Sequence, residues 1–218
     1  MIQKIKNPLF DSNENPETDL SKLKSPTSYS EKNRRKKEYK KLFNKESAIE
    51  ATKEFEKNVD VFGFTKGQFS LIDLIEATLD KTGPAHLTVS TWTAKTADLQ
   101  DVLKFLDKGR ILSARFLIDY SFQRRQPGAA QAIRQKFGAG SVKVSMNHAK
   151  FFMLGNDDGW KVTCKTSMNL NTNPRFEDFD LSNCYELFNF MQTMTAEIFS
   201  KGVKDGNETG SDVWSDWG

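Results

Sequence analysis

The chain has 218 residues, of which 37% are hydrophobic, and this length and composition allow one core-forming domain with appendages. No uninterrupted apolar run approaches the length of a membrane span, and the first residues lack the apolar stretch of a signal peptide. The net charge is only +3, and the two cysteines, Cys164 and Cys184, form no motif with metal-ligand spacing. These features exclude a membrane-spanning protein and a disulfide scaffold, and we expect a cytoplasmic protein with reduced thiols.

The N-terminal part divides into a polar leader and a basic arm. Residues 1–28 contain three prolines and many Asn, Ser and Asp residues, which predicts little fixed structure. Residues 29–57 contain good helix formers, and eight basic residues and a single acid lie between Lys32 and Lys45. We therefore expect a basic helical arm that either contacts a polyanion or lies solvated on the domain.

Residues 58–204 have a globular composition in which helical and strand patterns alternate. Apolar residues at helical spacing predict helices over 68–79, 96–106, 127–137 and 188–203. Alternating or β-branched runs predict strands over 86–92, 111–118, 142–145, 148–154, 160–166 and 181–187. This alternation predicts an α/β fold with a mixed, mostly parallel sheet flanked by helices.

Two residue pairs carry chemistry. His148 and Lys150 are separated by one residue in the predicted strand 148–154, so their side chains project to the same face. Ser167 and Asn169 have the same spacing after the next predicted strand. Neutral imidazole can attack phosphorus, while ammonium, hydroxyl and carboxamide groups can hold a phosphate. The two pairs therefore predict a phosphate site that needs no metal ion or cofactor.

Together with Glu177, these pairs resemble one copy of the phospholipase D superfamily motif. That motif is His-x-Lys with an Asp five residues later, then Gly-Ser-x-Asn, and usually a Glu beyond. The resemblance covers roughly residues 86–203 and is closest to the small nuclease branch, which has one motif per chain. It implies that the α/β fold is phospholipase D-like. Two positions depart from the motif, because Gly155 stands at the Asp position and Thr166 at the Gly position.

The resemblance implies a role for each residue of the motif. His148 would be the nucleophile, and its mate in a second chain would be the general acid. Lys150 and Asn169 would bind the phosphate with help from Ser167, and Glu177 would orient a histidine. Because this branch builds its active site across two chains, the lone motif implies a homodimer.

Two segments outside the motif suggest partners. The basic arm carries a set of side chains suited to a phosphate backbone: Arg34, Arg35, Lys36, Lys37, Lys40 and Lys41. Tyr39 lies among them and could stack on a base. The tail, residues 205–218, has four acids, no base, and Trp214 and Trp217, which are features of a docking peptide for a protein partner. A tail that folds back onto an apolar patch or onto the basic arm is the alternative.

The sequence therefore predicts a metal-independent phosphodiesterase that acts on nucleic acid through a phosphohistidine intermediate, with its active site shared across a homodimer. One alternative is a catalytically degenerate phospholipase D-like protein that binds DNA, RNA or partner proteins. Another is a phospholipid phosphodiesterase, although no membrane contact is expected. The small size, polar leader and lone motif indicate a phage or mobile-element context.

Overall fold

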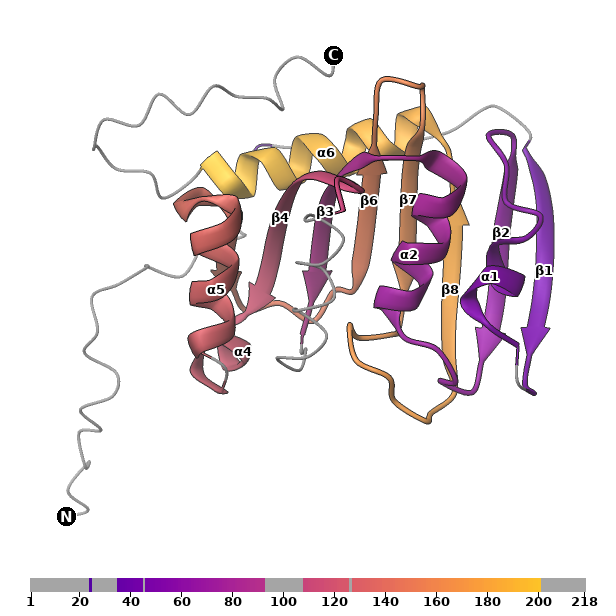
Figure 1. The fold of residues 1–218 in the computed structure, drawn as a ribbon, viewed down its shortest axis with the longest axis horizontal. Helices are drawn as coiled ribbons and strands as arrows, with labels where there is room; N and C mark the ends of the chain where they lie inside the picture. Colours follow the sequence, from indigo (N-terminus) through magenta and orange to yellow (C-terminus); the bar gives the residue numbers. More distant parts are fainter. Residues whose placement is uncertain (1–23, 25–34, 45, 93–107, 126, 201–218) are drawn as a thin grey trace.

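The computed structural model describes residues 24, 35–44, 46–92, 108–125 and 127–200, which form an eight-stranded sheet in the order β1-β2-β8-β7-β6-β3-β4-β5 (Figure 1). The strands are β1 (Lys36–Leu42), β2 (Val59–Thr65), β3 (Ala85–Thr91), β4 (Ile111–Asp119), β5 (Val142–Ser145), β6 (Phe151–Gly155), β7 (Lys161–Thr166) and β8 (Glu177–Ser182). The helices are α1 (Ala48–Thr52), α2 (Leu71–Thr82), α4 (Tyr120–Arg125), α5 (Pro127–Phe137) and α6 (Tyr185–Ser200), with a short 3-10 turn, η3 (Ala139–Ser141).

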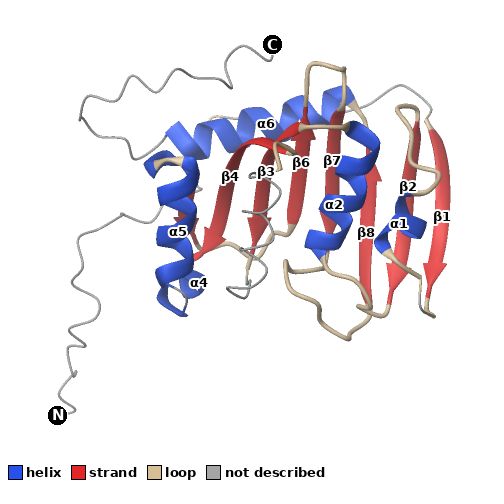
Figure 2. Ribbon diagram, viewed as in Figure 1, coloured by secondary structure: helices blue, strands red, loops and turns tan. Residues whose placement is uncertain are grey.

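Helices cover both faces of the sheet (Figure 2). Phe152 of β6 belongs to the main core, which also contains the apolar side chains of α2. Its neighbours Phe151 and Met153 point to the opposite face and pack with Phe188 and Met191 of α6, because successive strand residues alternate between faces. The expected α/β fold is therefore confirmed. None of the described helices is long and apolar enough to cross a membrane.

The expectation of a mostly parallel sheet is wrong. Three pairings are parallel, those of β1 with β2, β3 with β4 and β4 with β5. The pairings of β2 with β8, β8 with β7, β7 with β6 and β6 with β3 are antiparallel. Short connections join β6 to β7 and β7 to β8, and a short connection favours antiparallel neighbours. These three strands lie between β2 and β3 and make the sheet mixed.

The expected basic helical arm is also wrong where the structure describes it. Residues 36–42 form β1, an edge strand parallel to β2. Among the described residues of the arm only α1 is helical, and Ser47 is its N-cap and forms a capping box with Glu50. The segment is rich in good helix formers, which obscured the alternation of its side chains between two sides. On one of these sides Leu42 is buried. Lysines on an edge strand discourage pairing with a further strand, which fits the position of β1.

Most remaining boundaries agree with the sequence prediction to within a few residues. The strand expected over 148–154 begins only at Phe151, so the His-x-Lys pair precedes it. The strand expected over 181–187 is displaced, because β8 spans Glu177–Ser182 and α6 already begins at Tyr185. The helix expected over 96–106 lies outside the described residues. Strand β2 and helix α4 were not predicted.

Both cysteines are buried, and neither forms a disulfide bond. Burial raises the pKa of the Cys164 thiol well above its ordinary value, and the negative charge of Asp180 adds to the shift. This thiol therefore stays protonated and unreactive as a nucleophile.

Candidate functional site

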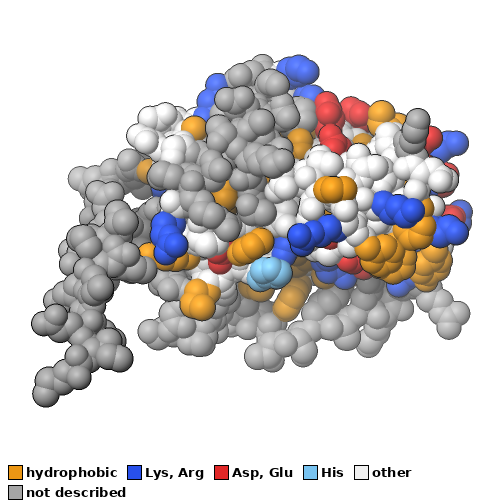
Figure 3. Space-filling view, turned by 90° about the horizontal axis from the view of Figure 1, so that it is seen from below, with side chains coloured by type: hydrophobic (Ala, Val, Ile, Leu, Met, Phe, Trp, Pro, Cys, Tyr) orange, Lys and Arg blue, Asp and Glu red, His pale blue; other side chains and the backbone are white. Residues whose placement is uncertain are grey.

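The predicted site residues come from segments that meet at one edge of the sheet. Strands β3, β4, β5 and β7 end at this edge, whereas β6 and β8 begin there, because β6 runs antiparallel to β3 and β7. Figure 3 views the edge, where a histidine side chain lies at the surface between hydrophobic side chains and lysine or arginine side chains. Residues 148–150 lead into β6, and residues 167–176 connect β7 to β8.

The His148 and Lys150 side chains contact each other, although both residues precede β6 and the contact does not arise from the strand alternation used in the prediction. The Lys150 ammonium nitrogen Nζ lies 3.2 Å from Nδ1 and 3.4 Å from Nε2 of the His148 ring, and it donates to the His148 carbonyl at 2.9 Å. An ammonium group has no acceptor, so a ring nitrogen that bonds to it must offer a lone pair. The His148 side chain is exposed and Lys150 is half-buried. An accessible imidazole with a cation beside it can therefore meet an anionic electrophile from solvent.

Buried groups that sequence reasoning missed hold this segment in place. Asn147 Nδ2 donates to Ser90 Oγ at 2.9 Å and to the Leu117 carbonyl at 3.2 Å, and its Oδ1 accepts from Ala149 N at 3.1 Å. Ser90 Oγ in turn donates to the Ala149 carbonyl at 2.8 Å. The main-chain groups on both sides of His148 are thus tied to β3 and β4. The one signal in the sequence is the Asn that directly precedes the His-x-Lys pair.

Trp92 is a second residue that the sequence did not single out for the site. Its ring centroid lies 5.5 Å from that of His148, with the planes inclined at 49°. Trp92 directly follows β3, so it lies at the same edge as His148. The indole lies against one side of the imidazole and presents an aromatic surface beside His148.

Ser167 and Glu177 are brought together where β7 ends and β8 begins. Ser167 Oγ donates to the Glu177 carboxylate and accepts from Asp178 N at 2.9 Å. Thr166 N donates to the Lys150 carbonyl at 3.1 Å, which places this hairpin directly beside the His-x-Lys segment. Glu177 is buried, with 7% of its surface exposed. A buried carboxylate bonded to a hydroxyl provides a fixed negative charge beside the proposed phosphate site.

Asn169 is buried, and its side-chain oxygen Oδ1 has no hydrogen-bond partner among the described residues. Its main-chain carbonyl accepts from Leu71 N, at the first turn of α2, at 3.3 Å. The backbone of Asn169 is therefore anchored while part of its amide remains unused. A buried polar atom without a partner is costly, and such atoms gather at functional sites.

The charges at the site affect Lys150. Partial burial lowers the pKa of its ammonium group below the ordinary value of 10.5, and the negative charge of Glu177 partly opposes that shift. Glu177 is therefore close enough to influence Lys150 electrostatically, although it bonds to Ser167. The structure thus groups His148, Lys150, Ser167 and Glu177, with Asn169 on the same connecting segment.

Packing accounts for both departures from the motif. A Cβ atom at Gly155 would lie 2.9 Å from Cζ of Phe188, so α6 leaves no room for an Asp at the end of β6. The Thr166 hydroxyl donates to the Asp178 carbonyl and accepts from Met168 N at 3.0 Å, and it fixes the turn that carries Ser167. Thr166 therefore has a structural role beside Ser167, whereas Gly155 lies at the far end of β6, where it pairs with His86 of β3.

The predicted nucleic-acid-binding residues differ in their partners. Arg35, which precedes β1, bonds to Asp60 at 2.7 Å, Lys36 pairs with Glu38 at 2.8 Å, and Lys40 pairs with Glu54. Lys37 and Lys41 are exposed together with Tyr39 on the side of β1 opposite to Lys36 and Lys40. Arg34, like Trp214 and Trp217 in the tail, lies outside the described residues.

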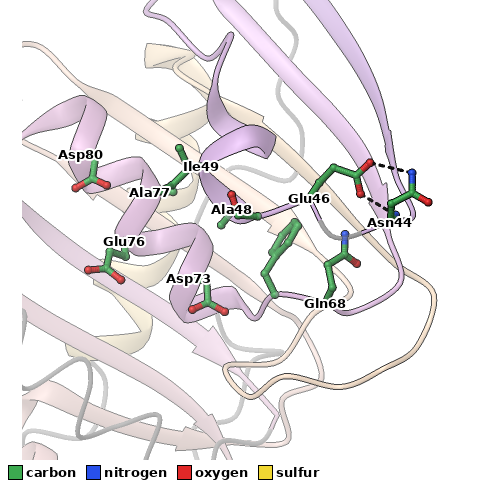
Figure 4. A pocket seen from close by; sticks show the side chains of 11 residues that line it. Asn44, Glu46, Ala48, Ile49, Gln68, Asp73, Glu76, Ala77 and Asp80 are labelled. Atoms are coloured by element: carbon green, nitrogen blue, oxygen red, sulfur yellow. Dashed lines mark hydrogen bonds between the residues drawn. The ribbon is translucent and has the colours of Figure 1, made fainter.

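A groove lies away from the candidate site, beside α1 and α2 (Figure 4). Its volume is about 700 Å³, and its lining includes Glu46, Asp73, Glu76 and Asp80. Each of these carboxylates has a local partner. Glu46 accepts from Asn44 N, Asp73 caps α2 through Ser70, and Glu76 and Asp80 pair with Arg110. None of the motif residues lines this groove.

A scan against protein-family models and a search of curated proteins found no match to this chain. Among solved structures, polyphosphate kinase from Porphyromonas gingivalis is similar with a TM-score of 0.44 and 6% identity, over 63% of this chain and 26% of that chain. Yeast tyrosyl-DNA phosphodiesterase is similar with a TM-score of 0.38 and 10% identity, over 58% of this chain and 46% of that chain. The chain spans about a quarter of the kinase and just under half of the phosphodiesterase.

Proposed function

We propose that this protein is a phosphodiesterase that cleaves nucleic acid through a phosphohistidine on His148. The observation that supports the proposal best is the position of Lys150 Nζ, 3.2 Å from the His148 ring, at a sheet edge shared with Ser167 and Glu177. An imidazole lone pair and an adjacent ammonium group are what an attack on a phosphodiester anion requires.

In the proposed reaction a ring nitrogen of His148 attacks phosphorus. A bond forms between nitrogen and phosphorus, and the bond from phosphorus to the leaving oxygen breaks. A general acid gives that oxygen a proton, and water then hydrolyses the phosphohistidine and regenerates the imidazole. Lys150 and the Asn169 amide hold the nonbridging oxygens. These steps are balanced without a metal ion or a redox partner.

The general acid is the reason to propose a homodimer. His86, the other histidine of the chain, bonds to Ser113 at 2.7 Å and lies where β3 begins, at the opposite edge of the sheet from His148. A second imidazole at the site therefore has to come from another copy of the chain. The exposed position of His148 leaves it accessible to such a copy.

The test is cleavage of a labelled oligonucleotide in EDTA by wild-type protein, by His148→Ala and by His86→Asn. We expect His148→Ala to lower the rate at least about a hundredfold, because it removes the nucleophile, and His86→Asn to act like wild type. A substrate with labelled phosphate should leave an acid-labile label on the wild-type and His86→Asn chains but not on His148→Ala. Cleavage by His148→Ala at the wild-type rate, or loss of cleavage in EDTA, contradicts the proposal.

A second candidate is a phosphate-binding protein without catalysis. The departure of Gly155 from the motif favours it, because Phe188 packs against the position where the motif has an Asp. This candidate predicts salt-sensitive binding of DNA or RNA that His148→Ala leaves intact, with no cleavage under any condition.

A further inference from the structure

Five aromatic rings form a continuous row from the site edge onto the sheet. The ring centroids of Phe43 and Phe176 are 5.9 Å apart, and those of Phe176 and Phe64 are stacked at 4.9 Å. Phe64 and Phe62 follow at 5.0 Å, and Phe62 and Tyr39 at 6.5 Å. We call these five residues the aromatic row. Phe176 directly precedes Glu177, so the row begins beside the candidate site.

The row lies on a part of the sheet that stays open. Tyr39 is 74% exposed and Phe176 is 64% exposed, and the other three rings are half-buried. Figure 2 shows that α6 begins beside β8 and runs toward β4, away from β1. In Figure 3, hydrophobic side chains gather at the right of the site edge beside lysine or arginine side chains. Exposed aromatic rings in a contiguous group indicate a binding surface.

Positive charge lies along the row. Lys66 Nζ and Lys41 Nζ are 5.4 Å and 5.8 Å from the centroid of the Phe43 ring, and Lys37 projects beside Tyr39. Two carboxylates on the same side are already engaged, because Asp60 accepts from Arg35 and Asp180 pairs with Lys165. Asp178 is the remaining acid of β2 and β8 on that side. The positive charge of the lysines therefore outweighs the negative charge of the acids along the row, which favours an anionic ligand.

A hollow of about 130 Å³ lies at the far end of the row. It is lined by Lys37, Tyr39, Asp60, Phe62 and Asp180. Its two aromatic rings suit a planar base, because the rings can stack on the face of the base. Lys37 can meet the adjoining phosphate.

We propose that the aromatic row binds single-stranded nucleic acid, with bases stacked on the rings and the backbone along Lys37, Lys41 and Lys66. The inference rests on the proposed function, since the row would guide a strand toward His148. Bases in a duplex are stacked on one another and do not expose their faces to protein rings. A single strand does, and stacking tolerates any sequence.

The experiment measures anisotropy of a labelled thymidine oligonucleotide and of a duplex of equal length, with all variants built on His148→Ala so that no cleavage occurs. We expect Tyr39→Ala and Phe176→Ala each to weaken single-strand binding by roughly five- to a hundredfold. Tyr39→Phe should bind normally because the ring is kept. Ile49→Ala is the matched control, because Ile49 is 66% exposed on α1. Thermal unfolding of each variant checks that the fold is unchanged.

The lysines are tested through salt. Lys37→Gln and Lys41→Gln should each reduce the slope of log affinity against log salt by about 0.7 for a single strand. Lys108→Gln, at an exposed turn before β4, should leave the slope unchanged.

Equal single-strand binding by Tyr39→Ala, Phe176→Ala and Ile49→Ala overturns the inference. It is also overturned if the duplex binds as tightly as the single strand and the aromatic variants weaken both to the same extent. This outcome is separate from that of the catalytic proposal. Cleavage by His148→Ala at the wild-type rate removes the phosphohistidine but not the aromatic row, and a row that binds nothing leaves the cleavage result standing.

Discussion

His148 is exposed, yet the groups that fix its main chain are buried. Asn147 bonds to Ser90, which lies 57 positions earlier in the chain, and to the Leu117 carbonyl. The sequence could indicate the contact between His148 and Lys150, because that contact is local. No local pattern could indicate Asn147 as the support of the segment, because its partners come from two other strands.

The charge state of Lys150 provides a test at the residue scale. Burial lowers the pKa of this ammonium group and Glu177 partly raises it again. Phosphate binding needs the protonated form, so affinity should be lost as pH rises through a value below 10.5. Glu177→Gln removes the contribution that raises the pKa, so the loss should move to lower pH. Titration of the Lys150 Cε resonance by NMR, together with inhibition by inorganic phosphate, measures both effects.

Lys161 supplies the control for that titration. Burial lowers its pKa as well, and Asp157 is the acid that opposes the shift. Asp157→Asn should therefore lower the pKa of Lys161 and leave Lys150 unchanged. An unchanged Lys150 midpoint in Glu177→Gln would show that Glu177 does not act on the site.

At the scale of elements, periodicity predicted those strands and helices whose own apolar residues mark a buried face. Strand β5 and helix α5 have the predicted bounds. Strand β1 was not predicted, because its lysines and glutamate are compatible with a helix and only pairing with β2 makes it a strand. Strand β8 was displaced in the prediction because three acids, Glu177, Asp178 and Asp180, obscure its buried alternation.

The contact between β6 and α6 makes a second prediction. Gly155→Asp restores the motif residue, yet it should destabilise the protein by about 1–3 kcal/mol, because the new side chain must displace the Phe188 ring. Gly140→Asp is the control, since a Cβ there meets no atom within 4 Å. Urea unfolding measures both. A Gly155→Asp variant as stable as Gly140→Asp would mean that α6 moves aside at little cost.

At the scale of the whole molecule, the proposed chemistry requires two chains. Sedimentation should give twice the 24.8 kDa of one chain at concentrations where cleavage is observed. On dilution, the activity per chain should fall as dimers separate, because each site needs His148 from both copies. A monomer that cleaves with undiminished activity per chain contradicts the shared site, and the binding candidate would then be preferred.

The strand order also has a consequence for the time at which the fold forms during synthesis. Strands β1 and β2 can pair early, and so can β3, β4 and β5, but nothing made by then joins the two groups. Strands β6, β7 and β8 fill the gap, and the connections that lead into and between them carry His148, Lys150, Ser167 and Asn169. A nascent chain on the ribosome therefore cannot complete the sheet until this last segment emerges. The step that joins the sheets also assembles the site, so a chain shortened before β8 lacks both.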